Sequence, residues 1–289
     1  MDRKQNLTAL LFTGPFLVAY LVIFIYPTIQ LVHLSFTDAP LIGAGAWIGF
    51  KNYIRLWNDG QMWKSVFNTF YFVLLTVIPT TIIGLALALM VNRLSGWFQS
   101  IVLACFFLPY ILPVSVVILI WQWVLDTQFG IAQPIISYFT GKPVAVFRDR
   151  YWAMPMVAFI TIWWTNGFNL LLFIAGLRNI SQDYYDAAAL DGAGRFKQFV
   201  YITLPLIWPV TALVLTIQLI LQLKIFDQVY LLTQGGPANA TYVMVQYIYK
   251  QAFQLNKGGY AATVSLALFA LIVILSVMQY QVLRSRGQK

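Results

Sequence analysis

Six long intervals without a charged side chain dominate this sequence. They run over residues 5–37, 65–92, 94–125, 151–177, 198–223 and 258–283. About 20 apolar residues carry a helix across the hydrocarbon core of a bilayer, where a charged side chain is costly. Each interval is long enough for one crossing. Only 9% of the residues are charged, against about 25% in soluble proteins, which excludes a water-soluble globular fold.

The intervals predict an all-α, polytopic membrane protein with a single transmembrane domain over residues 1–289. We expect its six helices at roughly 9–34, 66–92, 100–125, 152–177, 204–230 and 260–283. A further charge-free stretch, 228–249, is interrupted by Gly235, Gly236 and Pro237, so we interpret it as a structured loop. Six crossings place both termini on the same side of the membrane.

The distribution of Lys and Arg indicates which side that is. The 18 basic residues divide equally between the two sides. The segments on the side of the termini are shorter, however, and both tails are basic beside their helices, which favours cytoplasmic termini. The net charge of +9 does not indicate nucleic-acid binding, because the basic residues are scattered between apolar runs.

The loop between the fourth and fifth crossings, residues 178–205, has the pattern of two short helices. Ser181 can cap the first helix, and Gly192 and Gly194 end it. Residues 196–202 can form the second helix before Pro205 opens the next crossing. The alanines of the first helix form a small face that a cleft of another protein can approach closely. An amphipathic loop that merely covers helix ends is the alternative.

Three stretches resemble a known family. Asp186-Ala-Ala, followed by Gly192 and then Ile202-Thr-Leu-Pro, closely resembles the EAA coupling loop of bacterial ABC importer permeases. Trp47-Ile-Gly-Phe-Lys-Asn-Tyr and Leu231-Leu-Thr-Gln-Gly-Gly-Pro-Ala-Asn-Ala-Thr resemble the carbohydrate branch, the permeases like the first subunit of the maltose importer. The resemblance implies a cytoplasmic coupling helix that sits in a groove of an ATPase. The residues concerned are Asp186, Ala187, Ala188, Ala189, Asp191, Gly192, Ala193, Arg195 and Phe196. Asp186 stands where the family usually has Glu.

The same resemblance implies a set of partners in the bacterial cytoplasmic (inner) membrane. These are a second permease subunit, a dimer of ATP-binding subunits and an extracytoplasmic solute-binding protein that delivers a sugar. No stretch matches the phosphate-binding Gly-x-x-x-x-Gly-Lys-Ser/Thr pattern. We therefore expect no cofactor on this chain, and ATP with Mg²⁺ on the partner ATPase.

Composition argues against other functions. One His, one Cys and no Glu offer no catalytic or metal-ligating cluster, so we do not expect an enzyme. An ion-coupled secondary transporter would keep acidic residues within the membrane, yet every Asp lies outside the long apolar runs. The same fold importing another small solute remains an alternative.

Polar and aromatic side chains in the fourth and fifth crossings are the candidates for substrate binding: Trp163, Asn166, Asn169, Gln218, Gln222 and Lys224. Gln218 and Gln222 share a helix face, and their amides can pair with sugar hydroxyls. Alternatively, the Gln pair joins helices and the Trp residues belong to an aromatic belt. Our hypothesis for Lys224 is that it faces the pathway and favours an anionic sugar, such as a uronate, sulfonate or phosphate ester. It could instead snorkel or pair with Asp227.

Overall fold

The computed structural model describes residues 3–287, with side chains over 11–283. No strand occurs in the described range, where Thr37 and Trp47 form an isolated bridge. The predicted all-α class is therefore confirmed. The elements are α1 (Arg3–Tyr20), η1 (Leu21–Ile25), α2 (Tyr26–Ser35), α3 (Lys51–Asn58), α4 (Gly60–Val91), α5 (Gly96–Ile111), α6 (Val114–Val124), α7 (Gln133–Thr140), α8 (Ala153–Arg178), α9 (Gln182–Leu190), α10 (Arg195–Gln198), η2 (Phe199–Thr203), α11 (Leu204–Leu223), α12 (Asp227–Thr233), α13 (Met244–Tyr249), η3 (Lys250–Gln254) and α14 (Gly258–Gly287).

Five stretches of helix in the described chain are long and apolar enough to cross a membrane. They are Leu11–Ser35, Gly60–Val91, Ala153–Arg178, Arg195–Leu223 and Gly258–Leu283. A sixth candidate is the pair α5 and α6, which passes the same test as one unit but is bent by 100°. The chain is thus a multi-pass membrane protein.

The bend between α5 and α6 lies within the stretch 100–125, which we expected to be one crossing. α5 ends at Ile111, Leu112 is extended (φ −67°, ψ 138°), and Pro113 precedes α6. A proline ring clashes with helical backbone at the preceding residue, so the helix stops before Pro113.

The second short helix of the 178–205 loop is not a separate element. α10, the π-helical η2 and α11 follow one another without a break from Arg195 to Leu223. Pro205 has no N–H for the carbonyl four residues earlier, and the wider π turn of η2 lies where this bond is missing. α11 ends at Leu223 and α12 begins at Asp227, so the stretch 204–230 comprises two helices.

The chain falls into two compact units. The first runs to Met62 and resumes over Tyr247–Leu271, and the second comprises Trp63–Gln246 and continues from Ile272. The candidate coupling and substrate residues all belong to the second unit.

A polar cluster around Asp59 joins the two segments of the first unit. The Asp59 carboxylate accepts hydrogen bonds from the hydroxyls of Tyr247 and Tyr260, the latter at 2.7 Å. The Arg55 guanidinium lies 4.0 Å from the centre of the Tyr260 ring. Burial alone would raise the pKa of Asp59, but the tyrosine and backbone hydrogen bonds outweigh it and the pKa lies below its usual 3.8.

Close helix packing defines the second unit. A Cβ added at Gly167 in α8 would lie 2.2 Å from the carbonyl oxygen of Phe106 in α5. One added at Gly176 would lie 2.7 Å from Cδ1 of Ile207 in α11. Small residues let membrane helices approach this closely. α8 is therefore held between α5 and α11.

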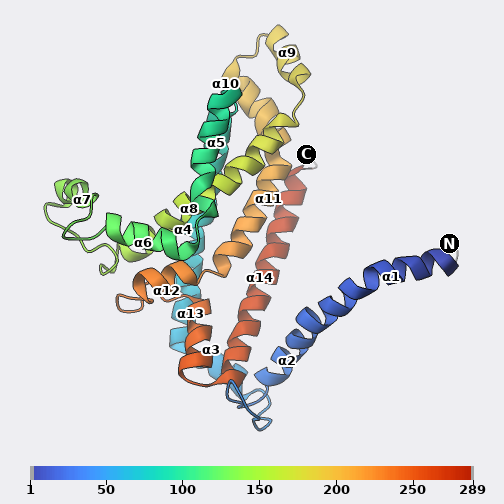
Figure 1. Cartoon of the computed structure of the whole chain (residues 1–289), viewed down its shortest axis with the longest axis vertical. Coiled ribbons are helices and arrows are strands. Elements are labelled where there is room, and N and C mark those ends of the chain that lie inside the picture. The colour runs from blue at the N-terminus through green and yellow to red at the C-terminus, as the bar shows by residue number, and fades with distance from the viewer. Residues whose placement is uncertain (1–2, 288–289) are drawn as a thin grey trace. The chain divides into compact units, whose positions relative to one another are not determined.

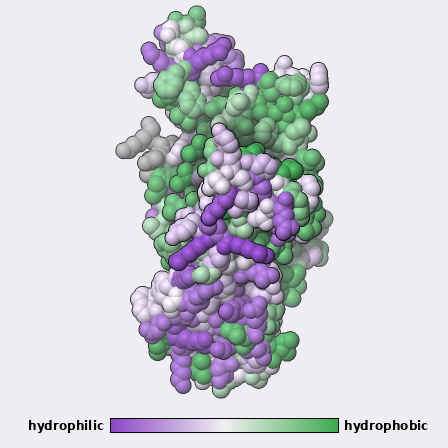
Figure 2. All heavy atoms as spheres, turned by 90° about the vertical axis from the view of Figure 1, so that its left-hand side faces the viewer, coloured by the Kyte–Doolittle hydropathy of each residue, from purple (hydrophilic) through white to green (hydrophobic). Residues whose placement is uncertain are grey.

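The ends of the second unit differ in character. α9 and α10 lie at one end of α11, and α12 lies at its other end (Figure 1). Hydrophilic and hydrophobic side chains are mixed at the top of Figure 2, where α9 and α10 lie, and hydrophobic side chains dominate directly below. This is the pattern of a helical hairpin at the surface of a membrane-embedded bundle.

Candidate functional site

α9 is an exposed surface helix. The Ser181 side chain accepts a hydrogen bond from the backbone N–H of Asp183 at 3.3 Å, which confirms the cap predicted for it. No residue of α9 is buried, and Leu190 at its end is 91% exposed. Leu190 is therefore accessible for contact with another protein.

The turn after α9 depends on one glycine. Gly192 has φ +76° and donates its N–H to the carbonyl of Ala189 at 3.0 Å. Ala193 donates to Ala188 at 2.8 Å, and the chain then enters α10 through Gly194 in extended conformation. Glycine adopts a positive φ without the steric penalty of other residues, so Gly192 allows the chain to turn here.

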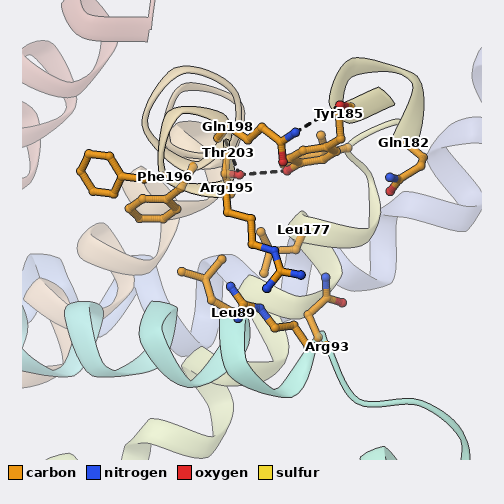
Figure 3. Close-up of a pocket in the computed structure, with 12 residues that line it drawn as sticks. Leu89, Arg93, Leu177, Gln182, Tyr185, Arg195, Phe196, Gln198 and Thr203 are labelled. Carbon is orange, nitrogen blue, oxygen red and sulfur yellow. Dashed lines mark hydrogen bonds between the residues drawn. The ribbon is translucent and has the colours of Figure 1, made fainter. Parts of the chain in front are cut away.

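Side chains tie α9 to the helix that follows the turn. The hydroxyls of Tyr185 and Thr203 are 3.0 Å apart, and the amide of Gln198 donates to the carbonyl of Tyr185 at 3.4 Å (Figure 3). We call α9, the turn and α10 with η2 the coupling hairpin, residues 182–203. These tethers were not foreseen from sequence, because the partners are far apart along the chain and neither residue type is distinctive.

The coupling residues proposed from sequence all lie on this hairpin. Asp186 is exposed, and its carboxylate accepts a hydrogen bond from the amide of Gln182 at 3.2 Å. Asp191 is exposed, and Phe196 is 79% exposed. The hairpin therefore presents carboxylates and apolar side chains outward together.

A cavity of about 870 Å³ separates the coupling hairpin from the helix ends below it. Its lining residues are Leu89, Asn92, Arg93, Leu177, Ile180, Gln182, Tyr185, Arg195, Phe196, Gln198, Phe199 and Thr203. They come from the ends of α4 and α8 as well as from the hairpin. Arg93 was not singled out from sequence.

A row of buried amides joins α11 to α8. Gln222 donates to the Gln218 side chain and Gln218 donates to Asn169, each at 2.9 Å. Asn169 is fully buried. The Gln face predicted from their spacing is thus observed, and in this conformation it also joins helices, as the alternative interpretation expected.

We call the side chains of Gln222, Gln218, Asn169 and Asn166 the amide row. Some polar atoms in and beside this row have no hydrogen-bond partner. Within the described chain, Nδ2 of Asn169, Oδ1 of Asn166 and Oγ1 of Thr80 have no hydrogen-bond partner, although all three are buried. A Cβ at Gly84 in α4 would lie 3.1 Å from Oδ1 of Asn166, so α4 also approaches this row. Thr80 and Gly84 were not predicted as site residues from the sequence, because small residues in a long apolar helix carry little signal. Because buried polar atoms without a partner are costly, these positions are candidates for contact with a ligand.

Two of the expected substrate residues lie apart from the row. Trp163 packs edge-to-face on Trp121, with ring centres 5.4 Å apart. Lys224 is exposed at the end of α11, and no ion pair joins it to Asp227 or to another described residue. Over the described residues, no three His, Cys, Asp or Glu side chains gather as a metal site would require.

The family can now be assigned. Residues 80–287 match the family model of the binding-protein-dependent transport system inner membrane component. This stretch includes the coupling hairpin and the amide row, and it makes up most of the chain. The chain belongs to this family. The permease is therefore an ABC transporter subunit in the membrane, and the family is not itself the ATPase.

Characterised relatives match the permease over nearly its whole length. It is 30% identical to the sulfoquinovosyl glycerol transport system permease protein SmoG of Agrobacterium fabrum, over 99% of this chain and 93% of that protein. It is 31% identical to the arabinooligosaccharides transport system permease protein AraP of Bacillus subtilis, over 93% and 86%. It is also 31% identical to the trehalose/maltose transport system permease protein MalF of Thermococcus litoralis, over 94% and 92%. The assignment to carbohydrate ABC importer permeases is confirmed.

Solved structures share the fold. A chain of a bacterial ABC transporter that imports the acidic polysaccharide alginate superposes with a TM-score of 0.85, covering 98% of this chain and 96% of that one, at 24% identity. A chain of a bacterial alginate ABC transporter in complex with an alginate pentasaccharide-bound periplasmic protein gives a TM-score of 0.86 at 23% identity.

Proposed function

We propose that the permease translocates a sugar or sugar derivative that a solute-binding protein delivers, and that a dimer of partner ATPases docked on the coupling hairpin supplies the energy. ATP and Mg²⁺ would bind those partners, and a second permease subunit would complete the pathway. The observation that carries this proposal is the coupling hairpin itself, an exposed structure whose second half continues without a break into α11. In this arrangement the hairpin and both termini face the cytoplasm.

Force applied to the coupling hairpin has a direct route into the bundle. α10, η2 and α11 form one continuous helix, and α11 carries Gln218 and Gln222. Movement of the hairpin on ATP binding would therefore shift the amide row against α8. This supports alternating access, in which ATP closes the ATPases and opens the pathway outward, and hydrolysis resets it inward.

Leu190→Arg tests the docking. The side chain is 91% exposed, so the change should leave the permease folded, while a charge on the apolar tip should prevent assembly. We expect the ATPase subunits to be lost when the permease is affinity-purified, and uptake into proteoliposomes to be lost with them. Ile42→Arg, at an 89% exposed apolar residue outside the hairpin, is the matched control. Normal ATPase recovery and uptake with Leu190→Arg would refute the docking surface.

The amide row is the proposed sugar site. Its unpaired Asn169 amide and Asn166 carbonyl provide one donor and one acceptor, as a sugar hydroxyl requires. The hydrogen bonds between Gln222, Gln218 and Asn169 would exchange for bonds to the sugar when the pathway opens. Trp163 would contribute an apolar ring face only if its packing on Trp121 changes.

Lys224 is the basis for proposing an anionic solute. It follows Gln222 by half a turn, is exposed and has no ion pair among the described residues. SmoG, a relative whose solute carries a sulfo group by name, is consistent with a negatively charged sugar. Lys224→Gln should reduce uptake of an anionic sugar much more than uptake of its neutral counterpart, measured in competition in the same vesicles. Equal losses for both sugars would remove the charge argument while leaving sugar transport intact.

A further inference from the structure

The cavity beneath the coupling hairpin is lined by basic side chains and by no acidic ones. Arg93 extends from the end of α4 and Arg195 from α10, and both guanidinium groups point into the cavity (Figure 3). The other polar lining groups are neutral, and no carboxylate lines the cavity. Both arginines are exposed, and because two like charges directed into one space repel each other, an anion bound between them would be stabilised by both.

A third arginine strengthens the positive field at this end of the bundle. Arg178, at the end of α8, donates to the side chain of Gln99 at 2.9 Å. Gln99 in turn donates to the carbonyl of Val91 at 3.0 Å, two residues before Arg93. The acidic residues nearest to Arg195 along the chain are Asp191 and Asp186, neither of which lines the cavity, and Asp186 already accepts a hydrogen bond from Gln182.

The depth of the cavity indicates the source of the anion. Arg93 lies two residues beyond the end of α4 at Val91, and Arg195 begins the candidate span Arg195–Leu223. Basic side chains at the ends of membrane-spanning helices are commonly found near the lipid headgroups, so we expect both arginines close to that level. Leu89 and Leu177 line the same cavity and give it an apolar wall. A phosphate with an attached apolar chain matches both the charged and the apolar lining.

We infer that this cavity binds the phosphate group of an anionic membrane lipid, held between Arg93 and Arg195. Arginine forks bind phosphate oxygens in bidentate fashion, and basic pockets between membrane helices on the cytoplasmic side hold anionic headgroups. The lipid would then contact the coupling hairpin and the end of α4 at once, linking transport activity to membrane composition. The inference needs the cytoplasmic placement of the hairpin but not the identity of the solute.

Native mass spectrometry of the purified full-length permease tests this. The chain is titrated in detergent with phosphatidylglycerol or with zwitterionic phosphatidylcholine, and we expect preferential binding of the former. Arg93→Gln/Arg195→Gln should weaken phosphatidylglycerol binding about 25-fold, because each basic residue near an anionic headgroup is worth a factor of about five. Lys142→Gln/Arg150→Gln removes two exposed charges elsewhere in the same unit and should bind as the wild type does. Arg93→Lys/Arg195→Lys should retain the preference, which separates loss of charge from loss of folding.

Three results would overturn the inference. The first is wild-type phosphatidylglycerol binding by Arg93→Gln/Arg195→Gln. The second is displacement of the lipid by millimolar inorganic phosphate, which would assign the cavity to a soluble anion. The third is loss of the lipid when the partner ATPase is added to the wild-type chain, which would assign the cavity to protein contact. Because the readout is lipid binding, the result is independent of sugar uptake.

Discussion

Gly192 provides the sharpest test of the coupling hairpin, because a substitution there strains the backbone without causing a steric clash. An added Cβ would meet nothing within 4 Å, so Gly192→Ala causes no clash. The only penalty is its φ of +76°, which costs a non-glycine residue about 1–2 kcal/mol. This corresponds to a roughly 5- to 30-fold loss of the native turn relative to alternative turns.

Proline at the same position is far more disruptive. Its ring holds φ near about −65° and removes the N–H, which here bonds to Ala189 at 3.0 Å. Gly192→Pro therefore cannot form the observed turn, and we expect ATPase stimulation and uptake to be abolished in reconstituted importer. Gly192→Ala should lower both partially. Thermal unfolding of the purified permease should change little, because the hairpin has no buried side chain in α9.

Two matched variants control for the substitution itself. Gly194, two residues after Gly192, has φ −69° and equally open surroundings, so Gly194→Ala should be neutral. Gly141 at the end of α7 has φ +74° and open surroundings, so Gly141→Ala carries the same backbone penalty without touching coupling. Normal coupling in Gly192→Pro, or an equal defect in Gly141→Ala, would refute the reasoning.

Three further predictions follow from packing and hydrogen bonding. Gly167→Ala should lower the melting temperature and yield of the permease, because the added Cβ would lie 2.2 Å from a backbone oxygen of α5. Such overpacking typically costs about 1–3 kcal/mol. An unchanged melting temperature would contradict the close approach. Tyr185→Phe removes the hydroxyl bonded to Thr203 and should cost about 1 kcal/mol locally, seen as faster amide exchange in α9; unchanged exchange would contradict the tether. Because folding lowers the pKa of Asp59, the ionised carboxylate stabilises the folded state above about pH 3.8, and this stabilisation is lost as the pH falls below that value. Asp59→Asn should remove this acid dependence from thermal unfolding curves.

Much of the fold follows from the sequence because a membrane leaves few choices. A charged side chain is excluded from the hydrocarbon core, so the charge-free intervals predict the helices closely. α4 ends at Val91 and α8 at Arg178, beside the expected limits of 92 and 177. The exceptions lie at prolines. Pro113 divides one expected crossing, and the helix continues through η2 where Pro205 was expected to open a new one.

The candidate sites were predictable only where residues are close in sequence. The four-residue spacing of Gln218 and Gln222 is enough to predict their shared face, and the structure shows them bonded. The bond from Gln218 to Asn169 depends on how α11 packs on α8, which no local pattern encodes. The same holds for Arg93 and Arg195, which the fold brings to one cavity from distant segments.

The uninterrupted helix from Arg195 to Leu223 would convert a small rotation at one end into a large displacement at the other. Its 29 residues extend about 44 Å at 1.5 Å per residue, and Gln218 lies about 34 Å from the end at Arg195. A tilt of about 5° pivoting at Arg195 displaces Gln218 by about 3 Å, as much as the full length of a hydrogen bond. A rotation this small would break the bond between Gln218 and Asn169. If the coupling hairpin moves on ATP binding as we propose, a slight change of angle at Arg195 is therefore enough to rearrange the amides of Gln218 and Asn169.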